Sequence, residues 1–437
     1  MSRPGHARIR RARPAPSDLC APNHLANASF VHSGRSSRPR CTKLPNPKSF
    51  GAWRLLVVAV AQPDPRPGAE QQDSPVAAST KTRKRSTAGN LPGVSTRVAT
   101  AFAPGRVNLI GEHTDYNDGL ALAFSVRAGV TVSAVAGSGE QLEVIAHDLG
   151  ARDTFSRREP GPASGWRAYV RGAVAELQEQ GYRPSATRLE IRSDLAIGAG
   201  MSSSAALTVA VCLALIAQGG EQPPAATALA RICQRVEARW AGAETGLLDQ
   251  LTSLLGTADH VLLIDFLTLE AQTLALDLRG FELVLLPTGQ ARTNAASGYN
   301  ERREQCREAA HRMRVESLRD ATIQDLHMLP DTLARRARHV ITENGRVLAA
   351  TRALGDGDLT ALGGLLDRSH ASLRDDFEVS TDAVEAAVAE LKAAGAVGAR
   401  LMGGGFGGSV LALMPPGTVA PAGATVVSPG PGAHLIA

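Results

Sequence analysis

The sequence predicts an α+β fold that begins near residue 91 and follows a proline-rich, basic segment. Beyond residue 91, short strand patterns alternate with longer helical patterns, and no internal repeat is present. The hydrophobic content of 43% is enough for a sizeable core, which excludes a chain that is disordered throughout. The longest apolar runs, Leu55–Ala61 and Leu207–Ala217, are shorter than the ~18–20 residues of a membrane span, so we expect no membrane partner.

Residues 1–90 differ in composition from the rest of the chain. They contain 16 Lys and Arg, four acidic residues and 11 of the 25 prolines, a net charge of +12. Such a segment buries too little apolar surface to offset its chain entropy, so we expect a disordered basic tail. A transit peptide, a tail for anionic partners and a mis-assigned start stay open. No Met occurs between Met1 and Met201, so an authentic start between them would use a non-ATG codon, for example at Val94 or Val98.

The charge and the cysteines of the remaining chain limit its partners. Residues 91–437 carry a net charge of −7, which gives no basic surface of the kind that binds nucleic acid. The five cysteines form no CxxC pair and no disulfide framework, which favours a reducing compartment and a cytoplasmic location. They are Cys20, Cys41, Cys212, Cys233 and Cys306. We also expect a monomer.

Nine segments carry the pattern of a regular element. Strand patterns occupy Val98–Pro104, Val130–Val135, Leu189–Arg192, His260–Ile264 and Glu282–Leu286. Helical patterns occupy Leu207–Ala217, Ala225–Glu237, Asn300–Met313 and Thr381–Ala393. The first of these helices is apolar on all sides and is followed by Gly219-Gly220, which is a typical helix stop.

The first polar cluster lies within Ala103–Gly119. Directly after Gly111 it contains a run of polar residues that includes Glu112, His113, Asp115, Tyr116, Asn117 and Asp118. A polyhydroxylated ligand needs such a set, because each hydroxyl group requires a donor or an acceptor in a fixed direction. On composition alone, a polar turn closed by Asn-Asp-Gly is the simpler interpretation.

The second cluster, Asp194–Leu207, is a strand end, a glycine-rich loop and three serines that open an apolar helix. Free backbone N–H groups at a helix N-terminus form an anion cradle, and serine hydroxyls add donors or a ligand oxygen for Mg²⁺. The loop is not a Walker loop, because the chain contains no Gly-Lys-Ser/Thr. A simple serine helix cap is the alternative, and three serines behind Gly-x-Gly favour phosphate over it.

Two more segments stand out further along the chain. Glu237 and the run Glu244–Gln250 bring three acidic residues close in sequence, although an isolated Asp such as Asp249 is more often a cap or a surface residue. Gly403–Gly408 fits the GxGxxG pattern, but no acidic residue follows it to bind a ribose, which excludes a dinucleotide site. The glycine run instead predicts a close approach of the backbone to a ligand or to another loop.

Taken in this order, the clusters resemble the signature motifs of the GHMP small-molecule kinases. Gly105–Asn117 (GRVNLIGEHTDYN) is similar to the signature of the galactokinase branch nearly letter for letter. The similarity continues in Gly246–Gln250, Ser297–Arg303 and Ser369–Ser380 and ends in the glycine run, so it covers residues 91–437.

The resemblance implies a function and a fold. It implies ATP- and Mg²⁺-dependent phosphorylation of D-galactose at the C1 hydroxyl, which gives galactose 1-phosphate and ADP. It also implies two domains, at residues 91–247 and 248–437, with the active site in the cleft between them. Only small molecules, the sugar and ATP, are expected as partners.

The resemblance also implies a role for individual residues. The sugar hydroxyls are expected to bind Glu112, His113, Thr114, Asp115 and Tyr299. The ATP phosphates are expected to bind the loop formed by Ala196, Ile197, Gly198, Ala199, Gly200, Met201, Ser202, Ser203 and Ser204. Ser202 and Glu237 are expected to hold Mg²⁺. Asp249 is expected to receive the proton of the C1 hydroxyl, with Arg106 as its cationic partner.

Two alternatives to this activity stay open. Non-catalytic galactose and ATP sensors that act in transcription resemble the enzyme but lack a Ser-Ala step in the serine loop; here Ser202–Ala206 is intact, which favours the enzyme. An N-acetylgalactosamine kinase would use the same sugar-binding set, and the room beside the C2 substituent cannot be read from sequence. The chain also departs from the family's usual residues at Ala196, Met201, Asp118, Ala123 and Leu248, and none of these changes removes a catalytic group.

Overall fold

The structure is a computed structural model that describes residues 97–196, 200–290 and 295–436. The chain divides into two units, Met1–Thr87 and Ala88–Ala437, and every described residue belongs to the second. The basic tail expected at residues 1–90 lies outside the described residues. Within the described ranges, no helix has both the length and the apolar character that crossing a membrane requires.

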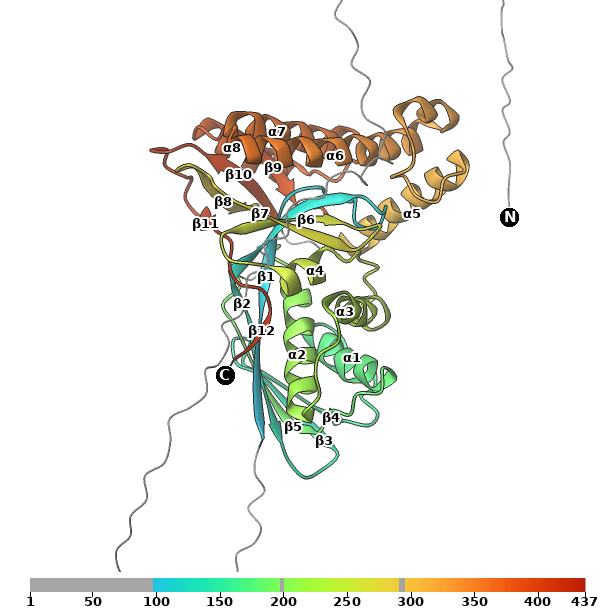
Figure 1. Cartoon of the computed structure of the whole chain (residues 1–437), viewed down its shortest axis with the longest axis vertical. Helices are drawn as coiled ribbons and strands as arrows, with labels where there is room; N and C mark the ends of the chain where they lie inside the picture. Colours follow the sequence, from blue (N-terminus) through green and yellow to red (C-terminus); the bar gives the residue numbers. More distant parts are fainter. Residues whose placement is uncertain (1–96, 197–199, 291–294, 437) are drawn as a thin grey trace, which may run out of the picture. The chain divides into compact units, whose positions relative to one another are not determined.

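An eight-stranded sheet forms the first half of the described fold (Figure 1). Its main path runs β12-β1-β2-β5-β3-β4. In addition, β6 pairs with the first residues of β2, and β7 pairs with β6. All pairs are antiparallel except β3 with β5. The strands are β1 (Val98–Ile110), β2 (Leu120–Ala136), β3 (Gln141–Ala146), β4 (Ala151–Ser156), β5 (Ala186–Ser193), β6 (His260–Asp265), β7 (Glu270–Ala275) and β12 (His434–Ile436).

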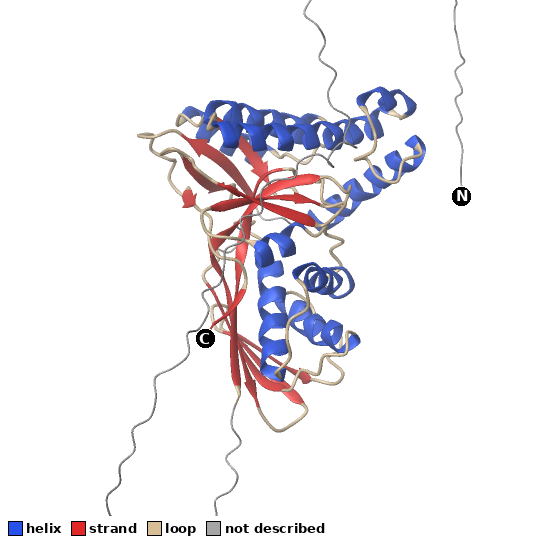
Figure 2. Cartoon of the chain, in the orientation of Figure 1, coloured by secondary structure: helices blue, strands red, loops and turns tan. Residues whose placement is uncertain are grey.

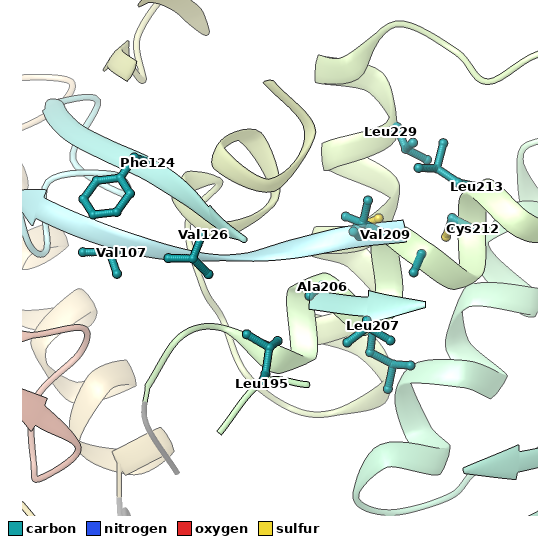
Figure 3. Close-up of a cluster of buried hydrophobic side chains, with 14 of the residues drawn as sticks. Val107, Phe124, Val126, Leu195, Ala206, Leu207, Val209, Cys212, Leu213 and Leu229 are labelled. Atoms are coloured by element: carbon teal, nitrogen blue, oxygen red, sulfur yellow. The ribbon is translucent and has the colours of Figure 1, made fainter. Parts of the chain in front are cut away.

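Four helices accompany this sheet: α1 (Trp166–Glu179), α2 (Ser203–Gly219), α3 (Ala226–Trp240) and α4 (Leu248–Leu255). Helix α2 packs on β1 and β2, while α1 and α3 pack on α2 and on each other (Figure 1). Figure 3 shows part of the resulting core, where Val126 of β2 lies in one apolar cluster with Ala206 and Val209 of α2. Because α2 is covered by the sheet on one side and by α1 and α3 on the others, its residues are apolar on all faces. The same packing fixes the position of its N-terminal serines.

A four-stranded antiparallel sheet, β11-β8-β10-β9, forms the second half. Its strands are β8 (Glu282–Pro287), β9 (Gly398–Met402), β10 (Ser409–Met414) and β11 (Thr425–Val427). The helices of this half are α5 (Ala295–Met313), the 3₁₀ helix η2 (Ile323–Met328), α6 (Asp331–Asp356), α7 (Leu359–Asp375) and α8 (Asp382–Ala393). Helices α7 and α8 pack on β9 and β10, and α6 packs on α7, as Figure 2 makes visible.

The nine elements expected from the sequence are all present. The five strand patterns fall within β1, β2, β5, β6 and β8, and the four helical patterns coincide with α2, α3, α5 and α8 to within a few residues. The expected domain boundary between residues 247 and 248 falls at the start of α4. After this boundary, β6, β7 and β12 still belong to the eight-stranded sheet of the first half. The boundary therefore stays a prediction.

Candidate active site

A tight turn at the end of β1 carries the first polar cluster. Gly111 has φ +108°, and a Cβ there would lie 2.6 Å from the carbonyl oxygen of Leu120, so the turn requires glycine. The Thr114 hydroxyl bonds to the carbonyl oxygens of Gly111 and Leu120, at 2.8 Å each, and the residue is fully buried. Thr114 therefore closes the turn and, unlike its expected sugar-binding neighbours, does not line the adjoining cavity.

The other residues expected at the sugar site line one cavity of about 370 Å³. It is lined from the first half of the fold by Arg106, Glu112, His113, Asp115, Tyr169, Ser202, Ser204, Ala243, Thr245, Gly246, Leu248 and Asp249, and from the second half by Tyr299, Asn300, Gly403, Gly404 and Gly405. Residues from the ends of β1, α2, α4 and α5 thus meet at one place, as the resemblance implied.

Asp249, in the first turn of α4, lies at the centre of a hydrogen-bonded group. Arg106 donates from Nε to Oδ1 of Asp249 at 2.6 Å and from Nη1 to the carbonyl oxygen of Gly200 at 2.8 Å. Ser202 donates from Oγ to Oδ2 of Asp249 at 2.5 Å. Burial opposes the charge of Arg106, but Asp249 and Glu112 outweigh it and raise the pKa of Arg106 above its usual value. The carboxylate is held on both oxygens and is neither a helix cap nor a surface residue.

The two carboxylates of the sugar set have opposite electrostatic surroundings. For Glu112, burial is outweighed by Arg400 and Arg106, which lower its pKa and keep it ionised. For Asp115, burial together with the charges of Asp249 and Glu112 raises the pKa to about 7. One carboxylate is thus a fixed acceptor near neutral pH, and the other can take up a proton there.

Aromatic rings surround His113, and one of them, Tyr299, lines the same cavity. Its Nδ1 lies 2.7 Å from the hydroxyl of Tyr116, and its ring centroid lies 5.3 Å from that of Tyr299 and 4.6 Å from that of Phe377. Burial and the neighbouring His339 lower the pKa of His113 to about 3, so the imidazole is neutral. Its Nε2 is buried, and the backbone of Gly404 also forms a hydrogen bond with the imidazole.

The serine loop has the backbone expected of an anion cradle. Ser202 is the N-cap of α2 with φ +56°, and Gly200 has φ +71°, so the chain turns sharply into the helix. The carbonyl oxygen of Met201 accepts the backbone N–H of Arg106 at 3.1 Å, which fixes this loop against β1. Of the loop residues expected at the phosphates, Ile197, Gly198 and Ala199 lie outside the described residues.

Glu237, on α3, lies beside the serines at the start of α2. It is buried and accepts hydrogen bonds from Ser204, at 3.4 Å, and from Thr245. Burial and the charge of Asp249 raise the pKa of Glu237 to about 7, and no cationic side chain pairs with it in the described ranges. Burying an ionised carboxylate without a counter-ion costs desolvation free energy, and a bound cation would offset that cost.

The glycine run makes the close approach predicted from the sequence. A Cβ on Gly404 would lie 2.8 Å from Cδ2 of Tyr299, and one on Gly405 would lie 2.5 Å from Cβ of Val379. Gly403 donates from its backbone N–H to Oε1 of Glu112 at 2.7 Å. The run therefore brings its backbone against two residues of the sugar set, and the prediction is confirmed.

A second cavity, of about 480 Å³, adjoins the first through Tyr169 and Ser204. Its walls are mostly apolar and include Val130, Leu149, Trp166, Ile191, Leu195, Ala196 and Leu207. Ser203 and Ser204 lie at its edge. The serine loop therefore separates a polar cavity from an apolar one.

Comparisons with known proteins relate this site to a family. Residues 93–135 match the galactokinase galactose-binding signature, residues 168–257 match the GHMP kinases N terminal domain and residues 349–429 match the GHMP kinases C terminal. The chain is 40% identical to the galactokinase of Thermotoga maritima over 312 residues, which span 71% of this chain and 88% of that protein. The chain belongs to the galactokinase family.

Other relatives of this galactokinase-family chain agree. It is 40% identical over 339 residues to the galactokinase of Haemophilus influenzae, across 75% of this chain and 86% of that one. The crystal structure of Lactococcus lactis galactokinase complexed with galactose is 31% identical, with a TM-score of 0.72, and covers 77% of this chain and 95% of its own. The Methanococcus jannaschii mevalonate kinase, at 15% identity and a TM-score of 0.54, covers 78% of this chain and 100% of its own and shares the fold alone. The expected GHMP kinase fold is confirmed.

Sequence reasoning missed several residues of this galactokinase-family site. Trp166 and Tyr169 line the apolar cavity from α1, a helix that was not expected. Arg400 contacts Glu112 from β9, and Thr245 bonds to Glu237. Thr245 lies within the run Glu244–Gln250 but was given no role, and the other three lie outside the polar clusters, so only a search for buried arginines or for aromatic residues near the serine loop would have found them.

Proposed function

We propose that this chain transfers the γ-phosphoryl group of ATP to the C1 hydroxyl of D-galactose. One observation carries the proposal. Asp249, fixed by Arg106 and Ser202, lies in a single cavity with the sugar-binding set on one side and the serine loop on the other. Phosphoryl transfer depends mainly on positioning and on neutralising charge, and this arrangement provides both.

The sugar is proposed to bind between Glu112, His113, Asp115 and Tyr299. Ionised Glu112 accepts hydrogen bonds from hydroxyl groups, Asp115 accepts them when ionised and can donate one when protonated, and the neutral His113 can donate or accept through its imidazole nitrogens. Because these groups are buried, a hydroxyl with the wrong stereochemistry leaves one of them unpaired. Such a loss typically costs ~1–3 kcal/mol.

The nucleotide is proposed to lie across the serine loop. The N-terminus of α2, from Ser202 to Ser204, offers backbone N–H groups and hydroxyls to the phosphates, and the helix dipole favours their charge. The apolar cavity beside it, with Trp166 and Tyr169, suits the base.

Mg²⁺ is proposed to bind at Ser202 and Glu237. Hydroxyl and carboxylate oxygens are ligands that Mg²⁺ prefers, and a cation would relieve the uncompensated burial of Glu237. Among the described residues there is no cluster of three or more His, Cys, Asp and Glu that could hold a metal alone, so phosphate oxygens of ATP would complete the ligand set. When bound, the ion would neutralise charge on the transferring phosphoryl group.

The chain's own residues then serve the transfer step. The C1 oxygen attacks the γ-phosphorus, its O–H bond breaks and the proton passes to the carboxylate of Asp249. The bond between the γ-phosphorus and the bridging oxygen breaks, and ADP leaves with that electron pair. Arg106 holds the Asp249 carboxylate in place and offsets negative charge that develops on the C1 oxygen.

A coupled assay of ADP release tests the proposal. With Mg²⁺, the protein is expected to release ADP with galactose and not with glucose, and chelation of Mg²⁺ is expected to stop the reaction. Sugar binding without ADP release would instead support a sensor, and faster release with N-acetylgalactosamine would support that kinase. A cytoplasmic location and a monomeric state stay proposals, and fractionation and analytical ultracentrifugation would test them.

A further inference from the structure

Arg400 is a fully buried arginine on β9 of the four-stranded sheet, and it contacts the eight-stranded sheet. Its Nη1 donates to the carbonyl oxygens of Asn108 and Leu109, at 2.9 and 3.1 Å, near the end of β1. Its Nη2 lies 3.0 Å from Oε1 of Glu112, just beyond that strand. A single guanidinium group thus contacts Asn108 and Leu109 near the end of β1 and Glu112 just beyond it.

These contacts determine where the Glu112 carboxylate lies. Oε1 of Glu112 accepts a hydrogen bond from the backbone N–H of Gly403 at 2.7 Å. The same oxygen forms the ion pair with Nη2 of Arg400. The hydrogen bond and the ion pair together restrain the rotation of the carboxylate. No other ion pair of Glu112 lies within 4.0 Å in the described ranges, so Arg400 is its single direct counter-ion there.

We infer that Arg400 is a positioning residue for sugar binding that acts through Glu112. The inference rests on the proposed function, because it assumes that Glu112 accepts a hydroxyl of the sugar. Arg400 does not itself line the cavity. It holds the acceptor in place and, from β9, ties the glycine run and the sugar-binding turn into one unit.

The planar fork of arginine is essential to this role. Two carbonyl oxygens and one carboxylate oxygen lie around a single guanidinium, and a lysine ammonium at this position cannot reach all three in the same geometry. Arg400→Lys keeps the charge and loses the fork, so Glu112 keeps a counter-ion but loses its orientation. The effect should fall on galactose and not on ATP.

Steady-state kinetics and galactose titration of the full chain test the inference. Arg400→Lys is expected to raise the KM and the Kd for galactose about tenfold, with the KM for ATP within about twofold of the wild-type value. Arg336→Lys is the matched control, because Arg336 is equally buried in the same half of the fold and pairs with Glu378. It is expected to lower thermal stability and to leave the galactose KM within about twofold.

A double-mutant cycle separates positioning from general damage to the fold. In a Glu112→Gln background, adding Arg400→Lys should change the galactose KM by less than about twofold, because the residue through which it acts is already altered. Should Arg400→Lys fail to fold, Arg400→Met with Glu112→Gln, which removes both charges, provides the cycle instead. Additive effects, or an unchanged galactose KM in folded Arg400→Lys, would overturn the inference. Wild-type protein that neither binds nor phosphorylates galactose would overturn the proposed function itself.

Discussion

The Nε atom of Arg106 lies 2.6 Å from Oδ1 of Asp249, although 143 positions separate the two residues in the chain. Arg106 sits on β1, six residues before the sugar-binding turn, and Asp249 sits in the first turn of α4. The Nη1 atom of the same arginine reaches the carbonyl oxygen of Gly200 in the serine loop. This single contact therefore places the proposed proton acceptor at the meeting point of the proposed sugar and phosphate sites.

Replacing Asp249 by asparagine should nearly abolish turnover. The amide keeps the shape of the side chain but removes the charge and the proton acceptor, and the loss in kcat for a positioned base is typically ~10²–10⁴-fold. Galactose and ATP should still bind, which calorimetric titration of the variant would measure. More than about half of the wild-type kcat in Asp249→Asn would mean that the carboxylate has no chemical role.

Arg106→Lys should also lower kcat strongly. A lysine cannot donate to Asp249 and to the carbonyl of Gly200 together, because it carries a point charge in place of a planar fork. We expect a loss of at least ~10-fold in kcat, with an unchanged fold by circular dichroism. Kinetics within about twofold of wild type would show that the charge alone is enough.

Gly246→Ala should weaken galactose binding. A Cβ at residue 246 would overlap Oδ2 of Asp115, so the carboxylate would have to move. We expect a rise of at least ~10-fold in the galactose KM. Gly345→Ala is the matched control, since a Cβ there meets no atom within 4 Å in the interior of α6. It should leave the KM unchanged and stabilise the fold by ~0.5–1 kcal/mol, measured by denaturant unfolding.

The contribution of His339 to the free energy of unfolding should fall as the pH drops from 6.5 to 4, in the direction opposite to the contributions of Asp115 and Glu237, whose pKa values are raised to about 7. Burial, above all, lowers the pKa of His339 to about 4, and its Nε2 lies 3.1 Å from the carbonyl oxygen of Glu112. In the unfolded chain, His339 therefore binds a proton near pH 6.5, whereas in the folded chain it binds one only near pH 4. The stability that neutral His339 contributes is present above pH 6.5 and is lost below it, on the order of 3 kcal/mol in total.

Urea unfolding between pH 4 and pH 8 would measure this dependence in wild type and in His339→Gln. The variant cannot titrate at residue 339, so the stability of wild type relative to the variant should decrease as the pH falls over this range. An equal slope in both proteins would remove His339 as a cause and leave His113, whose pKa is about 3, as the remaining buried histidine of the site.

The sequence predicted the parts of this molecule whose signal is local. The strand pattern of Val130–Val135 and the apolar run of Leu207–Ala217 each describe an element that packs on its neighbour in the core, so periodicity alone was enough. The polar cluster after Gly111 was found for the same reason. Its members are close together in the chain, and Glu112, His113 and Asp115 line one cavity.

The remaining features depend on contacts between distant residues. Arg400 is a lone arginine in a buried strand, and only the tertiary structure places it against Glu112. Thr114 stands within the polar cluster, and a motif cannot say which of its members faces the ligand and which closes the turn. Likewise, nothing local in the sequence indicates that Thr245 bonds to Glu237.

Identification of the product is the most direct test of the central claim, that Asp249 and its neighbours direct phosphoryl transfer to C1 of galactose. Phosphorus NMR of a reaction with the full chain, galactose, ATP and Mg²⁺ would report the new phosphate ester and its coupling to the sugar proton. The account predicts one product, phosphorylated at C1, in equal amount to ADP, and its loss in Asp249→Asn. A phosphate at C6, or ADP released with inorganic phosphate and no sugar ester, would contradict it.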